Sequence, residues 1–301
     1  MEASRLNATL PGGSLAAAKR VVADYVALTK PKVQSLLLLT TVATMLIAGE
    51  PSIGLIALTC LGGYLSAGGA GAVNHWYDRD IDLLMERTAD RPVASGRVSP
   101  RAALTFGLLL AALAVIELSV FVNPLAAALS FSGFLGYTVM YTFWLKRSTP
   151  QNIVIGGAAG AVPPLVGWAA VTGSLDLAAL YLFAIVFYWT PPHFWALSLL
   201  MKDEYAKVGV PMMPVVRGED ETRRQIVLYT ILVVTITLLP VAGGLFGGIY
   251  LLSAVVLDAF FLFFAVKLQQ IGTRPVALRL YLYSLGYLAL LFAAMVVDVK
   301  L

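Results

Sequence analysis

Long apolar runs separated by short polar connections make up most of this chain. A helix needs about 20 apolar residues to cross the hydrocarbon core of a bilayer. Nine runs approach this length, at residues 33–49, 53–74, 102–122, 125–145, 152–171, 177–200, 225–245, 247–267 and 279–298. The pattern predicts an all-α fold, a polytopic membrane bundle of about nine transmembrane helices.

Positive charge is confined to alternate connections. The connections after the first, third, fifth and seventh runs are short and carry no Lys or Arg. The N-terminal segment and the remaining connections hold all of the 21 Lys and Arg residues except Lys300. Because cytoplasmic loops of membrane proteins carry an excess of Lys and Arg, we expect a multi-pass protein of the cell membrane with its N-terminus in the cytoplasm and its C-terminus outside. The cations are explained by this topology and give no indication of nucleic-acid binding.

Composition supports a membrane protein. Hydrophobic residues make up 59% of the chain and charged residues 13%, whereas soluble domains have roughly 45–50% and about 25%. The single cysteine, Cys60, excludes a disulfide framework and a cysteine-based metal site. The start of the chain is polar and lacks the apolar core of a signal peptide. We expect a disordered cytoplasmic tail over residues 1–29 and a single transmembrane domain over residues 30–301.

The second apolar run ends in an acidic segment. Asn74, Asp78 and Asp82 are spaced four residues apart, so on a helix they share one face. Carboxylate and amide oxygens are hard ligands that suit Mg²⁺ or Mn²⁺. A solvated acidic helix end balanced by Arg79 and Arg87 is the alternative. The metal site is favoured because this face continues an apolar span, where unpaired carboxylates are costly.

Cations near this segment indicate the ligand. Mg²⁺ usually shares its coordination shell with substrate phosphates, and Arg91 follows the acidic residues. Lys146 and Arg147 end the fourth run on the same side of the membrane. Arginine binds phosphate oxygens in a bidentate manner, and lysine binds them as a point charge. The set predicts a diphosphate ligand, although Lys146 and Arg147 are also explained as a pair that sets topology.

The sixth run contains Pro191 and Pro192 close to its cytoplasmic end. Prolines break the hydrogen-bond ladder of a helix, and a membrane tolerates this where protein or a cavity satisfies the freed carbonyls. The neighbouring Tyr188 and Trp189 predict the wall of a central cavity that opens near the cytoplasmic face. A packing kink lined by interfacial aromatic residues is the alternative.

A second acidic segment follows this aromatic one. Asp203 is expected to anchor metal from the opposite side, and Lys207, one turn further on, to bind phosphate. The chain has two histidines. His75 lies in the first acidic segment, and His193 lies in the aromatic stretch that leads to the second. Each is either a ligand of a metal such as haem iron or a hydrogen-bonded packing element.

The pattern Asn74-xxx-Asp78-xxx-Asp82 resembles the UbiA superfamily of intramembrane prenyltransferases, and the resemblance extends from Lys30 to the ninth run. Residues 145–152, 189–197 and 209–216 are similar to the haem O synthases, a family within it. One departure is that many members carry a second DxxxD motif, whereas Lys207 stands four residues after Asp203 here. It leaves open whether a second magnesium ion is bound or whether the lysine supplies its charge.

The resemblance implies transfer of a farnesyl group from farnesyl diphosphate to a vinyl group of haem B, which gives haem O and diphosphate. It implies diphosphate-bound Mg²⁺ as cofactor, contact with membrane lipid, and as partner the enzyme that converts haem O to haem A or a terminal oxidase. We expect metal ligands at Asn74, Asp78, Asp82 and Asp203, catalytic roles for Asp78, Asp203 and Lys207, and substrate contacts at Arg91, Lys146, Arg147, Tyr141, Tyr188, Trp189, His193 and His75. The alternatives are a quinone-type or chlorophyll-type prenyltransferase and, from another class, a transporter. Transporters place essential polar groups near the bilayer midplane, whereas the acidic segments here lie at one edge and the buried charges elsewhere are few, Glu117 and Asp258.

Overall fold

The computed structural model describes residues 12–301, and this part of the chain is helical without a β-strand. Nine of its helical segments are long and apolar enough to cross a membrane. They are α2 (Pro31–Ala48), α3 (Ile53–Tyr77), α5 (Pro100–Phe121), α6 (Pro124–Leu135) with its continuation to Arg147, α7 (Asn152–Gly160) joined to α8 (Val162–Thr172), α9 (Leu177–Leu200), α12 (Gly218–Ala242), α13 (Gly248–Ile271) and α14 (Arg274–Lys300). For the described part of the chain, the predicted all-α bundle of nine transmembrane helices is confirmed.

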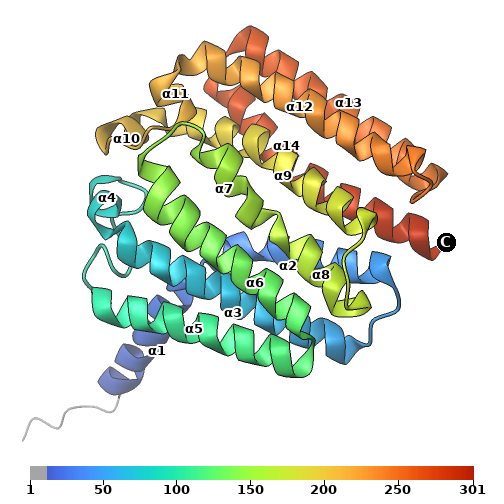
Figure 1. The fold of residues 1–301 in the computed structure, drawn as a ribbon. Helices are drawn as coiled ribbons and strands as arrows, with labels where there is room; N and C mark the ends of the chain where they lie inside the picture. The colour runs from blue at the N-terminus through green and yellow to red at the C-terminus, as the bar shows by residue number, and fades with distance from the viewer. Residues whose placement is uncertain (1–11) are drawn as a thin grey trace, which may run out of the picture.

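Three short helices lie together at one end of this bundle. They are α4 (Arg79–Leu84), α10 (Lys202–Lys207) and α11 (Met213–Val216). Figure 1 shows them at the end opposite to the C-terminus, next to the C-terminal ends of α3 and α9. The two acidic segments of the sequence are therefore at the same end of the molecule.

The prediction of a disordered tail over residues 1–29 is wrong for residues 12–28, which form α1 (Gly12–Leu28); residues 1–11 lie outside the described part. Alanine-rich sequence favours a helix, but a short helix is marginal in water unless it is packed against something. Here Leu28 is fully buried, and the Tyr25 ring meets Phe106 of α5 edge to face at 4.9 Å. Asp24 also pairs with Arg97 at 2.9 Å. Tertiary contacts at its C-terminal half thus hold α1 in place.

The fourth span is not a regular α-helix. After α6 the chain forms a π-helix, η1 (Gly136–Trp144), and then a short 3₁₀ turn, η2 (Leu145–Arg147). The fifth span is divided at Ala161, just before two prolines. The sixth span behaves differently from expectation, because α9 continues through Pro191 and Pro192 without interruption.

Helices α3 and α5 approach each other closely through glycine. A Cβ atom on Gly69 would lie 2.6 Å from the carbonyl oxygen of Gly107, and a Cβ atom on Gly107 would lie 2.8 Å from that of Gly69. Small residues allow such close backbone contact between membrane helices. This contact fixes the last turns of α3, which carry Asn74.

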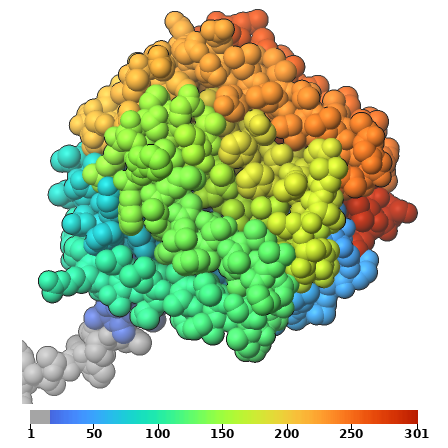
Figure 2. Space-filling model, viewed as in Figure 1, coloured from blue at the N-terminus to red at the C-terminus, as the bar shows by residue number. Residues whose placement is uncertain are grey.

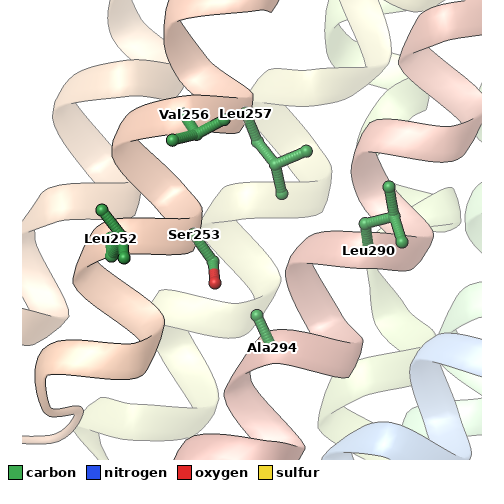
Figure 3. A pocket seen from close by; sticks show the side chains of 6 residues that line it. All are labelled: Leu252, Ser253, Val256, Leu257, Leu290 and Ala294. Atoms are coloured by element: carbon green, nitrogen blue, oxygen red, sulfur yellow. The ribbon is translucent and has the colours of Figure 1, made fainter.

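Two apolar grooves occur on the outside of the bundle. One, of about 370 Å³, lies between α13 and α14 and is lined by side chains such as Leu252, Ser253 and Leu290 (Figure 3). The other, of about 550 Å³, lies between α2 and α14. Neither is lined by a residue of the acidic segments. Figure 2 shows the near face filled by side chains of the green and yellow-green segments, which include α6 to α8. The central cavity stays a prediction.

Candidate active site

The first acidic segment forms a buried polar cluster where α3 meets α4. Asp78 lies between the two helices and Asp82 lies on α4. Asn74, Asp78 and Asp82 are 3%, 0% and 2% exposed, which contradicts the alternative of a solvated acidic helix end. The Asn74 Nδ2 donates to Asp78 Oδ2 at 2.7 Å. The expected shared face is therefore present for this pair.

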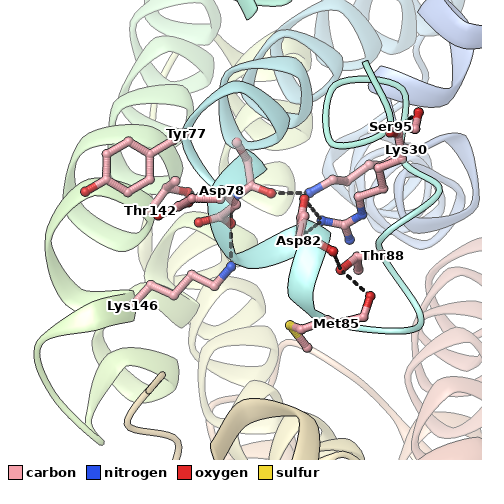
Figure 4. Close-up of polar contacts among 12 residues, drawn as sticks. Lys30, Tyr77, Asp78, Asp82, Met85, Thr88, Ser95, Thr142 and Lys146 are labelled. Carbon is pink, nitrogen blue, oxygen red and sulfur yellow. Dashed lines mark hydrogen bonds and ion pairs between the residues drawn. The ribbon is translucent and has the colours of Figure 1, made fainter. Parts of the chain in front are cut away.

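Cations surround the two carboxylates (Figure 4). Lys146 donates to Asp78, and Nη1 of Arg91 donates to both oxygens of Asp82, at 2.9 and 2.7 Å. Buried carboxylates need such partners because water is not available to solvate them. Both cations come from positions that the sequence assigned to phosphate binding.

Arg147 is directed mainly to a different acid. Its guanidinium donates to both carboxylate oxygens of Asp80 at 2.7 Å and reaches an Asp78 oxygen only at 3.4 Å. The hydrogen bonds from Arg147 lower the pKa of Asp80 to about 2. Arg147 thus lies at the rim of the cluster, with its Nη1 and Nη2 atoms directed mainly to Asp80.

Lys30 belongs to the candidate site, although the sequence pattern explains it only as one of the cations that set topology. It precedes α2, and its Nζ donates to Asn74 Oδ1 at 2.6 Å and to the Tyr137 hydroxyl at 3.4 Å. Burial, and then the nearby Arg91 and Lys146, lower its pKa to about 7. Lys30 also has φ 54° and ψ 55°, a left-handed conformation that is disfavoured for a residue before proline. Local strain of this kind clusters at functional sites. The signal in the sequence was the Lys30-Pro31 pair just before the first apolar run.

The π-helix carries further side chains into the cluster. Thr142 Oγ1 accepts from Asn74 Nδ2 at 3.2 Å, and the rings of Tyr137 and Tyr141 lie 5.5 Å apart. Tyr141 packs against Gly156 so closely that a Cβ atom there would lie 2.5 Å from the ring. Short π-helical segments are rare and frequently occur at functional sites. The predicted substrate residue Tyr141 is thus next to the cluster.

The second acidic segment is less closely involved. Asp203 and Lys207 are exposed on α10, and neither forms an ion pair with another described residue. Within residues 12–301, no group of three or more His, Cys, Asp or Glu side chains lies close enough together to hold a metal ion, so Asp203 does not join Asp78 and Asp82 in such a group. The role of Asp203 as a second metal anchor, and that of Lys207 at phosphate, stay predictions. Tyr205, between them, is only 5% exposed, and burial raises the pKa of its hydroxyl.

The aromatic segment of α9 packs against α14. The His193 ring stacks on Trp189 at 4.3 Å and on Tyr281 at 5.0 Å, and its Nδ1 lies 2.7 Å from Ser284 Oγ. Tyr188 packs instead against other rings, with Phe187 at 5.1 Å. The packing explains how this segment is held, and the cavity-wall interpretation stays untested.

His75 lies on α3 beside Asn74 and is 3% exposed. Its Nδ1 has no hydrogen-bond partner among the described residues. Its predicted contact with haem stays a prediction.

The chemistry of the buried cluster fits a divalent metal that is shared with a phosphate ligand. Two carboxylates and an amide are the hard donors that Mg²⁺ prefers, and they are too few to complete six-coordination. Lys30, Arg91 and Lys146 converge on the same three side chains. Oxygens of a bound diphosphate would complete the shell and replace the carboxylates as partners of the cations.

The sequence matches the UbiA prenyltransferase family over residues 37–296. The chain belongs to this family. Together with the nine apolar helices found within residues 12–301, membership identifies a multi-pass membrane protein.

Relatives with a more specific name are similar over most of the chain. A protein of Chloroflexus aurantiacus named protoheme IX farnesyltransferase is 58% identical over 93% of this chain and 48% of its own length. The chain thus spans about half the length of this curated relative. A protein of Deinococcus radiodurans with the same name is 53% identical over 91% of this chain and 92% of its own length.

Solved structures agree with the fold. A digeranylgeranylglyceryl phosphate synthase has a TM-score of 0.77 and 20% identity, covering 93% of this chain and 99% of that one. A UbiA homologue from Archaeoglobus fulgidus, solved with DMAPP and Mg²⁺, has a TM-score of 0.68 and 15% identity, covering 90% of this chain and 99% of that one. At these identities the likeness concerns the architecture of the UbiA family.

Proposed function

We propose that this protein transfers a farnesyl group from farnesyl diphosphate to a vinyl group of haem B. The use of a prenyl diphosphate as donor is supported by one observation, the buried Asn74–Asp78–Asp82 cluster with cations around it. The choice of haem is supported by the name of the relatives that are 53–58% identical. The products are haem O and diphosphate.

The diphosphate head binds between α3, α4 and the end of the fourth span. Asn74, Asp78 and Asp82 hold a divalent cation on it, and Asp203 from α10 completes the set. Mg²⁺, when bound, supplies charge stabilisation to the departing diphosphate. Solved UbiA homologues with Mg²⁺ and a prenyl diphosphate support this cofactor.

Cationic side chains take up the charge that develops as the C–O bond breaks. Lys146 and Arg91 transfer their hydrogen bonds from Asp78 and Asp82 to phosphate oxygens, and Lys30 does so from Asn74. Lys207 and Arg147 approach from the rim. Such preorganised donors stabilise a leaving group without reorganisation at the moment of reaction.

The allylic cation that remains is held in apolar surroundings. Aromatic faces stabilise cations, and Tyr141, Tyr188 and Trp189 are the candidates. Exclusion of bulk water prevents hydrolysis of the cation before it meets the acceptor.

The acceptor is haem B, with His193 or His75 as ligand of its iron. The terminal vinyl carbon donates its electron pair to C1 of the farnesyl cation. Water then adds to the other vinyl carbon and releases one proton, which leaves a hydroxyl group in the product. Farnesyl diphosphate, haem B and water thus give haem O and diphosphate.

The setting of the reaction follows from the charge distribution. We place the protein in the cell membrane, with the acidic segments and the N-terminus on the cytoplasmic side and the C-terminus outside. The farnesyl chain keeps the product in the membrane. The partner that takes up haem O is an enzyme that converts it to haem A or a terminal oxidase.

The test uses purified protein in lipid nanodiscs with farnesyl diphosphate, haem B and Mg²⁺. We expect haem O by mass spectrometry and one diphosphate released per haem O. Omission of haem removes the acceptor and should reduce diphosphate release to background. Unmodified haem together with prenylation of an aromatic quinone precursor would refute the proposal in favour of a quinone-type enzyme. Absence of diphosphate release with every acceptor would favour a transporter.

A further inference from the structure

The side chain of Ser284 on α14 forms a hydrogen bond with the imidazole ring of His193 on α9. The Ser284 Oγ lies 2.7 Å from His193 Nδ1 and, on its other side, donates at 2.7 Å to the carbonyl oxygen of Tyr281. Ser284 is fully buried, so no water competes for these contacts. The serine hydroxyl therefore has two partners of known position.

Counting protons assigns the tautomer of the imidazole. A serine hydroxyl has one hydrogen to donate and lone pairs to accept with. Its hydrogen is used by the carbonyl of Tyr281, and a carbonyl can only accept. The contact with His193 then requires Nδ1–H as the donor. In the neutral ring this leaves Nε2 without a hydrogen and with its lone pair free.

The same serine restrains the ring through its backbone. The carbonyl oxygen of Ser284 accepts from Trp189 Nε1 at 2.9 Å. Trp189 and Tyr281 stack on the His193 ring with interplanar angles of 16° and 27°. The imidazole is thus fixed between two aromatic faces, and Nε2 has no hydrogen-bond partner among the described residues.

We propose that Ser284 is a positioning residue that holds His193 as the Nδ1–H tautomer, so that Nε2 ligates the iron of the haem acceptor. The inference rests on the proposed function for the identity of the acceptor. Histidines that ligate metals almost always donate their other N–H to a fixed acceptor, which orients the ring. The arrangement of Ser284 and His193 has this form.

The position of His193 suits an acceptor that lies within the bundle. It precedes the end of α9 at Leu200 by seven residues, which corresponds to about 10 Å along the axis. The acidic segments lie at that end of the bundle. A porphyrin held here through its iron would lie below the diphosphate site and not compete with it for the cations.

The first measurement needs no haem. The protein labelled with ¹⁵N-histidine is studied by NMR in nanodiscs at neutral pH, and its two histidines are assigned with His193→Ala. We expect His193 to show a protonated Nδ1 and an unprotonated Nε2, and Ser284→Ala to lose this single-tautomer signature. A wild-type His193 with its proton on Nε2 would overturn the proposal, whatever the protein catalyses.

The second measurement is haem titration followed by absorption and EPR spectroscopy. We expect the wild type to show histidine ligation of ferric haem, and Ser284→Ala to bind haem about 10- to 100-fold more weakly, as for loss of an outer-shell partner. Ser284→Thr keeps the hydroxyl and should restore the histidine spectrum. Ser198→Ala is the matched control, because Ser198 is also fully buried and donates to an i−3 carbonyl at 2.9 Å but forms no hydrogen bond with a histidine among the described residues.

The outcomes separate the two hypotheses. Haem that binds to the wild type and is farnesylated, but without a histidine ligand, would overturn the role of Ser284 and leave the proposed function intact. Haem that neither binds nor reacts, with the expected tautomer present, would refute the proposed function and with it the ligation of iron. Equal loss of haem affinity in Ser198→Ala and Ser284→Ala would show a purely structural effect and overturn the inference.

Discussion

Asp78 and Lys146 form an ion pair in which the carboxylate is completely buried and the lysine side chain is 12% exposed. Lys146 comes from the end of the fourth span and Asp78 from the junction of α3 and α4, so the pair joins elements 68 residues apart in the sequence. Removing one partner of a buried pair leaves an uncompensated charge. The pair therefore contributes to the order of the site before any ligand is bound.

Lys146→Met should destabilise the protein by about 3 kcal/mol, the lower end of the cost of breaking a buried ion pair, because Asp78 keeps the hydrogen bond from Asn74 and the longer contact with Arg147 at 3.4 Å. The measurement is unfolding in detergent without Mg²⁺. Lys146→Met combined with Asp78→Asn should recover part of this loss, because the remaining amide is neutral. Additive losses in this double-mutant cycle would contradict a direct coupling of the two side chains.

Asp78→Ala should abolish haem O formation in membranes supplied with farnesyl diphosphate, haem B and Mg²⁺, because it removes a buried oxygen ligand and the partner of Lys146. Product is measured by mass spectrometry and normalised to folded protein. Asp220→Ala is the control, because Asp220 is 96% exposed on α12. Full activity in Asp78→Ala would refute the assignment of Asp78 as a metal ligand.

Chelation tests the same assignment without a mutation. Because the described residues contain no group of three metal-binding side chains of the His, Cys, Asp and Glu types, the cation should bind weakly to the protein alone and tightly only with diphosphate. EDTA should therefore stop turnover, and Mg²⁺ should restore it fully. Calorimetry should detect Mg²⁺ binding with a farnesyl diphosphate analogue present and little without it. Tight binding of Mg²⁺ to the ligand-free protein would argue for a preformed metal site instead.

The helical spans and the first acidic cluster could be predicted because both depend on local periodicity. An apolar run of membrane length has few alternative structures, and a spacing of four places Asn74 beside Asp78 on any helix. The sequence pattern gave no basis for the π-helix after α6, because its geometry depends on packing such as that of Tyr141 on Gly156.

Tertiary contacts account for the remaining differences. Lys30 enters the site only because the start of α2 lies beside Asn74 and Tyr137, which are 44 and 107 residues away. Asp258, left without a role by the sequence, accepts hydrogen bonds from Tyr287 at 2.6 Å and Thr237 at 2.7 Å. Its contacts join three helices and explain how a carboxyl group is accommodated inside the bundle.

Gly69→Ala should reduce both stability and activity. The added methyl group would lie 2.6 Å from the carbonyl oxygen of Gly107 and force α3 away from α5. Overpacking of this kind usually costs about 1–3 kcal/mol, and the shift would displace Asn74, which is five residues further along the same helix. Gly160→Ala is the matched control, since a Cβ atom at Gly160 meets nothing within 4 Å. Equal behaviour of the two variants would contradict the close approach.

Arg97→Ala should release α1 from the loop that follows α4. The guanidinium of Arg97 pairs with Asp24 of α1 at 2.9 Å and with Asp90 of the loop at 2.7 Å. Asp90 is almost fully exposed and the other two groups are partly exposed, so the effect on global stability should stay within about 1 kcal/mol. Local opening of α1 needs less free energy than global unfolding, so limited trypsin digestion should cut faster at Lys19 and Arg20 in the variant. Arg101→Ala removes an exposed arginine that forms no ion pair with a described residue, and it should leave the cutting rate unchanged. Equal protection of Lys19 and Arg20 in Arg97→Ala and the wild type would mean that Leu28 and Tyr25 hold α1 without the ion pair.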